Sequence, residues 1–156
     1  MSHFDLRSLL EALNERGVRF VVIGGVAVGA HGYPRATADL DVVPDPDPEN
    51  LDRVVSALDA LDATLPTVGG RSFDPNGDAG TIRRGGNVTA DTRFGGLDVI
   101  QLARGVPSYS TLDQDAVESN LLGVPVRICS LDRLREMKEA QDRPQDRADL
   151  ENLPNG

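Results

Sequence analysis

Residues 20–43 read FVVIGGVAVGAHGYPRATADLDVV, and this stretch determines the predicted fold. After Arg19, residues 20–23 form a short apolar run rich in β-branched side chains, which predicts a buried strand. Gly24 and Gly25 interrupt the run, and residues 26–31 predict a short helix. A second predicted strand, residues 39–43, ends at Pro44. This alternation of strands and helices is typical of an α/β or α+β domain.

The glycine pair marks a place where the backbone can approach a ligand. Glycine has no side chain, so Gly24 and Gly25 allow close contact, and the free N–H groups of a following helix attract anions. The stretch contains no G-x-G-x-x-G pattern, which excludes the dinucleotide-binding fingerprint. A P-loop is also excluded, because the only lysine, Lys138, lies far away in the sequence.

Three aspartates are the candidate catalytic and metal-binding residues. Asp39 and Asp41 are separated by one apolar residue, so on a strand their carboxylates point the same way. Two neighbouring carboxylates repel each other unless a cation lies between them, and Mg²⁺ commonly binds one or two carboxylates together with substrate phosphates. Asp98 is a lone acid in a later apolar strand and is the best candidate for a third ligand. The pattern favours metal-dependent phosphoryl-type transfer.

The rest of the chain predicts further helices and strands around this region. Apolar periodicity and capping residues predict helices over residues 2–16, 48–61, 131–141 and 146–153, with Ser2 and Ser130 as N-caps. We predict strands over residues 81–84, 87–92, 97–102 and 124–129, a loop over residues 66–80, and a turn of helix within residues 110–118. The organisation predicted is a single domain, with a core over residues 18–130 and a C-terminal helical segment over residues 131–153.

Composition excludes several classes of protein. The 156 residues carry 25 acidic and 16 basic side chains, and a net charge of -9 argues against a general nucleic-acid coat, although a local basic pocket is compatible with it. No apolar run is long enough to cross a bilayer, and the N-terminus does not resemble a secretory signal. The single cysteine, Cys129, rules out a disulfide within the chain, and we expect a cytoplasmic protein with no membrane partner.

Together these residues resemble the signature of the polymerase-beta-type nucleotidyltransferase superfamily. The resemblance rests on the Gly24-Gly25 pair, Asp39-x-Asp41 and the later Asp98. Within that superfamily the chain is similar to the small bacterial proteins that include the AbiEii-type toxins. Residues 131–138 and 142–150 resemble the last motif of that group, in which a lysine and downstream arginine and aspartate residues face the nucleotide.

The resemblance implies a mixed β-sheet flanked by helices that binds a nucleoside triphosphate with two Mg²⁺ ions, or Mn²⁺. It implies that Asp39 and Asp41 hold the metals and that Asp98 completes one metal site and helps to deprotonate the acceptor hydroxyl. Nucleotide contacts are predicted for Gly24, Gly25, Arg35, Thr37 and Lys138. The roles of Arg143, Asp146 and Asp149 stay open, between nucleotide contacts and surface charges.

Two functions from different classes follow. The first is a nucleotidyltransferase whose acceptor is unidentified: an RNA such as tRNA, a protein hydroxyl or a small molecule. If the chain is the toxin of a toxin–antitoxin pair, a cognate antitoxin is the expected partner. The alternative is a non-catalytic nucleotide-binding or interaction module on the same fold. No zinc site is predicted, because we expect His31 to be satisfied by the backbone and Cys129 to lie in the core.

Overall fold

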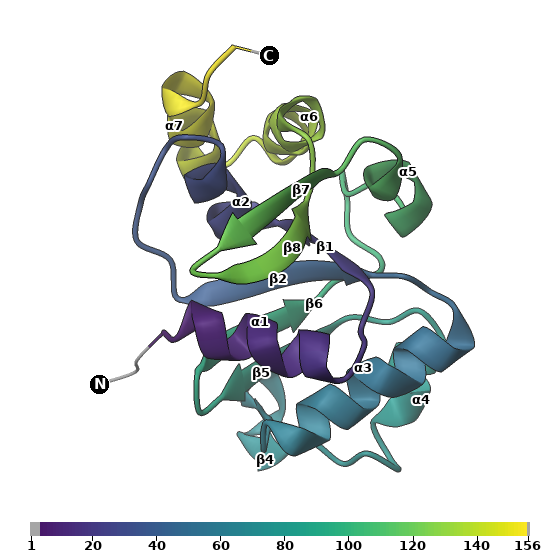
Figure 1. The fold of residues 1–156 in the computed structure, drawn as a ribbon. Coiled ribbons are helices and arrows are strands. Elements are labelled where there is room, and N and C mark those ends of the chain that lie inside the picture. Colours follow the sequence, from purple (N-terminus) through teal and green to yellow (C-terminus); the bar gives the residue numbers. More distant parts are fainter. Residues whose placement is uncertain (1–3, 156) are drawn as a thin grey trace.

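The computed structural model describes residues 4–155 and contains one eight-stranded mixed sheet with helices on both of its faces (Figure 1). This confirms the predicted α/β (α+β) class with a mixed sheet flanked by helices. The helices are α1 (Leu6–Glu15), α2 (Gly24–Ala30), α3 (Pro48–Ala60), α4 (Ala79–Arg83), α5 (Tyr109–Gln114), α6 (Leu131–Gln141) and α7 (Pro144–Asn152), with a 3₁₀ turn η1 (Pro66–Val68). The strands are β1 (Phe20–Ile23), β2 (Asp39–Pro44), β3 (Thr64–Leu65), β4 (Arg71–Ser72), β5 (Val88–Thr92), β6 (Gly95–Val99), β7 (Val117–Leu121) and β8 (Val124–Ile128).

The strands follow the order β4-β3-β5-β6-β2-β1-β8-β7 across the sheet. The central strand β2 runs antiparallel to β1 and parallel to β6, and β1 runs parallel to β8. The pairs β5–β6 and β7–β8 are antiparallel. This order places the ends of β1, β2 and β6, which carry the predicted site residues, next to one another.

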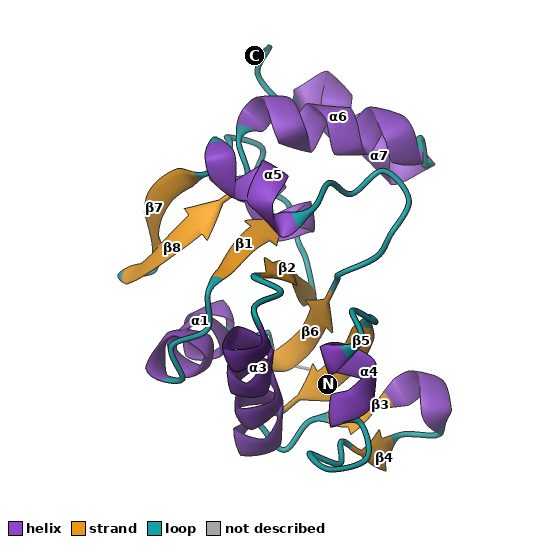
Figure 2. Ribbon diagram, turned by 90° about the vertical axis from the view of Figure 1, so that its right-hand side faces the viewer, coloured by secondary structure: helices purple, strands orange, loops and turns teal. Residues whose placement is uncertain are grey.

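The helices lie in two layers, one on each face of the sheet (Figures 1 and 2). Helices α1 and α3 pack on one face, where α1 buries Leu9, Leu10 and Leu13 against the sheet. Helices α2 and α5 cover the other face, and α6 packs behind α2 with α7 beside it. All four residues of β1 are buried, as expected for a strand covered on both faces. The hydrophobic core therefore lies on both sides of the β1–β2 pair.

Capping side chains define where several helices begin. The hydroxyl of Ser130 accepts a hydrogen bond from the N–H of Arg133 at 3.1 Å, as its predicted role as the N-cap of α6 requires. The predicted cap Ser2 lies outside the described residues, and Asp5 caps α1 instead by accepting from the N–H of Ser8 at 3.1 Å. Within residues 4–155, no helix is both long and apolar enough to cross a membrane.

One predicted strand is wrong, and several short elements were not predicted. Residues 81–84, predicted as a strand, lie mainly in α4, because burial of Ile82 against α3 favours a helical turn that four residues of sequence cannot specify. The predicted turn of helix within residues 110–118 is confirmed by α5 (Tyr109–Gln114), whereas strand β7 (Val117–Leu121) was not predicted. The predicted loop 66–80 also contains η1 and β4.

Candidate active site

One pocket of about 400 Å³ contains every site residue that the sequence predicted. It lies where β1 and β2 meet α2, with β6 on one side and helices α6 and α7 on another. Its lining includes Gly24, Gly25, Arg35, Thr37, Asp39, Asp41, Asp98 and Lys138. The structure thus brings together residues that are far apart in the sequence, from Gly24 to Lys138. Their chemical roles remain predictions.

Strand register places the carboxylates. In the parallel β2–β6 pair, Asp41 lies opposite Asp98 and Asp39 lies opposite Gly96. Paired residues point to the same face of a sheet, so Asp41 and Asp98 are direct neighbours and their carboxyl groups share a hydrogen bond. The carboxylate of Asp39 extends over Gly96, where a methyl group in place of the glycine hydrogen would collide with it.

The Asp41–Asp98 pair holds a proton near neutral pH. Burial raises the pKa of Asp41 to about 7, and the negative charge of Asp98 and the hydrogen bond to Asp98 add to this effect. Burial also raises the pKa of Asp98, although the hydrogen bonds from Asp41 and Thr89 oppose the rise. A divalent cation could take the place of this proton and bridge the two carboxylates.

Replacing Asp41 with asparagine is expected to stabilise the ligand-free protein above about pH 7 and to change its stability little near pH 4. The folded-state pKa of about 7 exceeds the ordinary value of 3.8, so ionisation of Asp41 costs the folded wild-type protein stability as the pH rises through this window. The cost is on the order of 2 kcal/mol, or ~5 °C in Tm. Thermal unfolding in EDTA across this pH range measures it. The same pH dependence in both proteins would contradict the prediction.

The donor set fits a magnesium ion in part. Asp41 and Asp98 offer two adjacent carboxylates, and Mg²⁺ typically takes one or two carboxylates while phosphates and water supply its remaining ligands. Nowhere in residues 4–155 is a group of three or more His, Cys, Asp or Glu side chains arranged to hold a metal ion by itself. Metal binding at this pocket would therefore depend on ligands from a bound nucleotide.

The glycine turn is required by packing. Gly24 has a φ of +74°, and a side chain there would also collide with the carboxylate of Asp41. At Gly25, an added Cβ would lie 3.1 Å from the hydroxyl of Thr37 and 3.3 Å from the guanidinium of Arg35. Both glycines are thus explained by the close approach of these side chains, and contact with phosphate stays a prediction.

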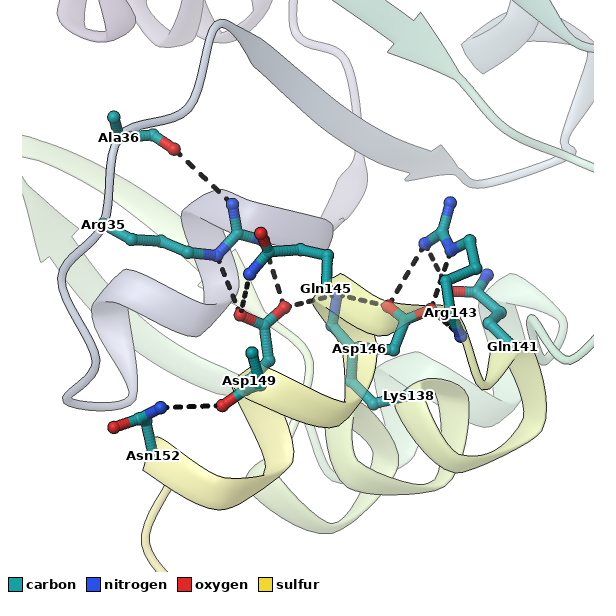
Figure 3. A network of polar contacts seen from close by, with 10 residues as sticks. Arg35, Ala36, Lys138, Gln141, Arg143, Gln145, Asp146, Asp149 and Asn152 are labelled. Carbon is teal, nitrogen blue, oxygen red and sulfur yellow. Dashed lines mark hydrogen bonds and ion pairs between the residues drawn. The ribbon is translucent and has the colours of Figure 1, made fainter.

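Three cations also line the pocket, and two buried aspartates hold them (Figure 3). The carboxylate of Asp149 accepts from the guanidinium of Arg35 at 2.9 and 3.1 Å and lies 3.0 Å from the ammonium of Lys138. Asp146 bonds the same ammonium at 3.1 Å and accepts from Arg143 at 2.7 Å. Burial opposes ionisation of Asp146, but the hydrogen bonds from Arg143 and Lys138 lower its pKa to about 2.

This arrangement assigns positions to the residues whose roles were left open. Arg143 lines the pocket, whereas Asp146 and Asp149 are fully buried and lie behind the cations. Lys138, predicted to contact the nucleotide, lines the pocket too, but it is 5% exposed and its ammonium already contacts both aspartates. Its charge reaches the site electrostatically, since it lowers the pKa of Asp41. In this structure Lys138 links α6 to α7, and its contact with a nucleotide stays a prediction.

An apolar wall was not anticipated from the sequence. Ile100 and Val106 line the pocket together with Leu134 and Met137 of α6. The spacing of Leu134, Met137, Lys138 and Gln141 on one side of a helix was the signal that could have indicated it, because residues at i, i+3, i+4 and i+7 share a face.

The expectations for His31 and Cys129 are confirmed. The Nε2 of His31 donates to the carbonyl oxygen of Cys129 at 2.7 Å, so backbone satisfies this ring. Cys129 is fully buried, and burial raises the pKa of its thiol to about 12.

Comparison with solved structures places the fold in a known class. A Thermotoga maritima protein provisionally named a nucleotidyltransferase superimposes with a TM-score of 0.60 over 94% of this chain and 88% of that chain, at 12% sequence identity. ANT(2")-Ia, solved in complex with adenylyl-2"-tobramycin, gives a TM-score of 0.56 over 92% of this chain and 82% of that chain, at 16% identity. The chain therefore has a nucleotidyltransferase fold. No protein-family model matches it, and no curated protein matches it in sequence.

Proposed function

We propose that this protein is a metal-dependent nucleotidyltransferase that transfers a nucleoside monophosphate from a nucleoside triphosphate to an acceptor hydroxyl. The observation that carries the proposal is the pair of Asp41 and Asp98, which lie opposite each other on β2 and β6 in the same pocket as the glycine turn. The shared fold with two nucleotidyltransferase structures supports the same reaction class.

Each group in the pocket has a role in this reaction. The acceptor oxygen attacks the α-phosphorus and forms a new P–O bond, while the bond to the β-phosphate breaks and pyrophosphate leaves. Asp98, whose pKa is raised by burial, would take the hydroxyl proton. Arg35 and Arg143 line the same pocket as the aspartates and would stabilise the negative charge of the triphosphate.

A divalent cation, Mg²⁺ or Mn²⁺, supplies charge neutralisation between the triphosphate and the carboxylates. Asp41 and Asp98 would hold it together with the phosphates, and Asp39, which within residues 4–155 forms no metal-binding group of three with them, would join only once nucleotide is bound. The apolar wall of Ile100, Val106 and Met137 would exclude water from the nucleotide. Experiment has to determine the number of ions and the preferred nucleotide.

The direct test is thermal unfolding with each of the four nucleoside triphosphates, with and without Mg²⁺ or Mn²⁺. A ligand at 100 times its dissociation constant adds about 2.7 kcal/mol, which raises the Tm by several degrees. We expect a metal-dependent rise for at least one triphosphate. A rise that does not require metal would favour the alternative of a non-catalytic nucleotide-binding module, and no rise with any nucleotide would contradict donor binding.

The acceptor is proposed only as a class. RNA such as tRNA, a protein hydroxyl and a small molecule each suit an attacking hydroxyl, and incubation with α-labelled nucleotide would identify the labelled class. We also propose, from the likeness of residues 131–150 to the AbiEii-type motif, a cytoplasmic toxin with a cognate antitoxin. Growth arrest on expression, and its loss with Asp98→Asn, would support that role; unaffected growth would oppose it.

A further inference from the structure

Strand β7 forms an open edge of the sheet. It lies at the end of the strand order and pairs only with β8. Leu122 and Gly123 form a two-residue turn with φ values of 53° and 85°, which makes Leu121 and Val124 the hydrogen-bonded closing pair. Counting back along the strand, Glu118 and Asn120 occupy the positions whose N–H and C=O groups point away from β8.

Nothing within the described chain occupies those outward groups. Among residues 4–155, no backbone hydrogen bond outside the strand ladder involves Glu118 or Asn120. Exposed strand edges are usually shortened, or protected by proline, lysine or a bulge. The opposite edge, β4, is only two residues long, whereas β7 has five residues and contains neither proline nor lysine. The β7 edge is thus suited to pairing with another strand.

We propose that β7 pairs with β7 of a second copy of this chain, antiparallel, about a two-fold axis through Ser119. In this register Glu118 faces Asn120 of the second copy, and the two residues exchange both backbone hydrogen bonds. The two-fold axis repeats the pair, so four hydrogen bonds join the copies. Ser119 faces its own symmetry mate at a non-hydrogen-bonded position.

Two other registers would also let the outward-pointing N–H and C=O groups of the two β7 strands face each other. Charge excludes one of them, and turn geometry excludes the other. A shift one way places Glu118 opposite Glu118, and like charges directly opposite each other destabilise a sheet. A shift the other way places Glu118 opposite Leu122, which lies in the turn with a positive φ and cannot continue the ladder. Only the register centred on Ser119 avoids both problems.

The apolar side chains fit the same register. Val117 and Leu121 point to the face of the sheet that carries the buried Val124, Val126 and Ile128 of β8. Val117 is 46% exposed in the single chain, and pairing places it opposite Leu121 of the second copy. The dimer would therefore continue the apolar face across the axis, which adds hydrophobic stabilisation to the hydrogen bonds.

Cysteine cross-linking tests the axis directly. Facing residues at a non-hydrogen-bonded antiparallel position have Cα atoms about 4.5 Å apart, within disulfide range. Ser119→Cys is therefore expected to form an intermolecular disulfide under mild oxidation, on the order of tenfold faster than Glu118→Cys or Asn120→Cys, whose symmetry mates lie on the diagonal at roughly 7 Å or more. The native Cys129 is fully buried and gives no background.

Sedimentation velocity of the unmodified chain provides the second measurement. We expect a concentration-dependent dimer that is strengthened by salt, because each copy carries a net charge of -9. Asn120→Pro removes one outward N–H without affecting the β7–β8 ladder and should yield monomers with an unchanged circular dichroism spectrum. A monomer up to millimolar concentration, or equal cross-linking at all three positions, would overturn the proposal, as would a dimer that survives Asn120→Pro.

Discussion

Replacing Asp41 and Asp98 together with asparagine is expected to abolish metal-dependent nucleotide binding while the protein stays folded. Asparagine preserves the size of each side chain and removes the charge that would attract a cation. The two acids lie opposite each other on β2 and β6, and burial raises the pKa of both, so their replacement also removes the cost of ionising them inside the protein. The thermal shift produced by nucleoside triphosphate with Mg²⁺ should disappear, and any transferase activity should fall by at least about 10³-fold.

Asp91→Asn is the matched control. Asp91 lies on the neighbouring strand β5, opposite Gly96, and so points to the same face as the catalytic candidates, but it lies outside the pocket. The Asp91→Asn substitution removes one negative charge from the same part of the sheet and should preserve the thermal shift produced by nucleoside triphosphate with Mg²⁺. Retention of metal-dependent binding by the double variant would contradict the assignment of Asp41 and Asp98. Loss of binding in both proteins would indicate a general electrostatic effect instead.

Asp149→Ala is expected to destabilise the protein by about 3–5 kcal/mol, or roughly 10 °C in Tm. The Asp149 carboxylate is fully buried and contacts both Arg35 and Lys138. Its removal leaves the nearly buried ammonium of Lys138 with Asp146 as its only remaining carboxylate in the described chain, and it frees Arg35 from α7. Equilibrium unfolding in urea measures the loss. The effect should be largely independent of nucleotide, because it arises from the buried charges.

An exposed ion pair is the control for that loss. Asp52 and Arg83 approach to 2.8 Å on the surface, where both side chains are 56% exposed. Asp52→Ala should change the stability by less than about 1 kcal/mol, because water screens the pair. If the two alanine variants were equally stable, the α6–α7 network would be an ordinary set of surface charges.

Local sequence determined much of the candidate site. Alternation places Asp39 and Asp41 on one face of a strand, and the glycine pair marks the turn before α2, both of which depend on residues a few positions apart. The caps and apolar stripes of α3 and α6 are equally local signals. These features agree with the structure because short-range sterics and hydrogen bonds decide them.

Strand β7 could not be predicted in the same way. Its sequence, VESNL, has a single β-branched residue and carries no clear alternation of apolar and polar residues. Pairing with β8 through the Leu122–Gly123 turn stabilises it, and that depends on a neighbouring strand. The four residues 81–84 illustrate the converse, since packing against α3 selects a helix there.

The sequence by itself determined the residue types of this site, their order and the class of fold. Only the tertiary structure decided that Asp98 lies beside Asp41, that Asp39 extends over Gly96, and that Asp149 reaches back to Arg35. The reason is physical: strand register and buried ion pairs join segments distant in the chain, and the free energy of those contacts depends on burial and distance. Neither the burial of a residue nor its distance in space from another can be read from the spacing of residues in the sequence.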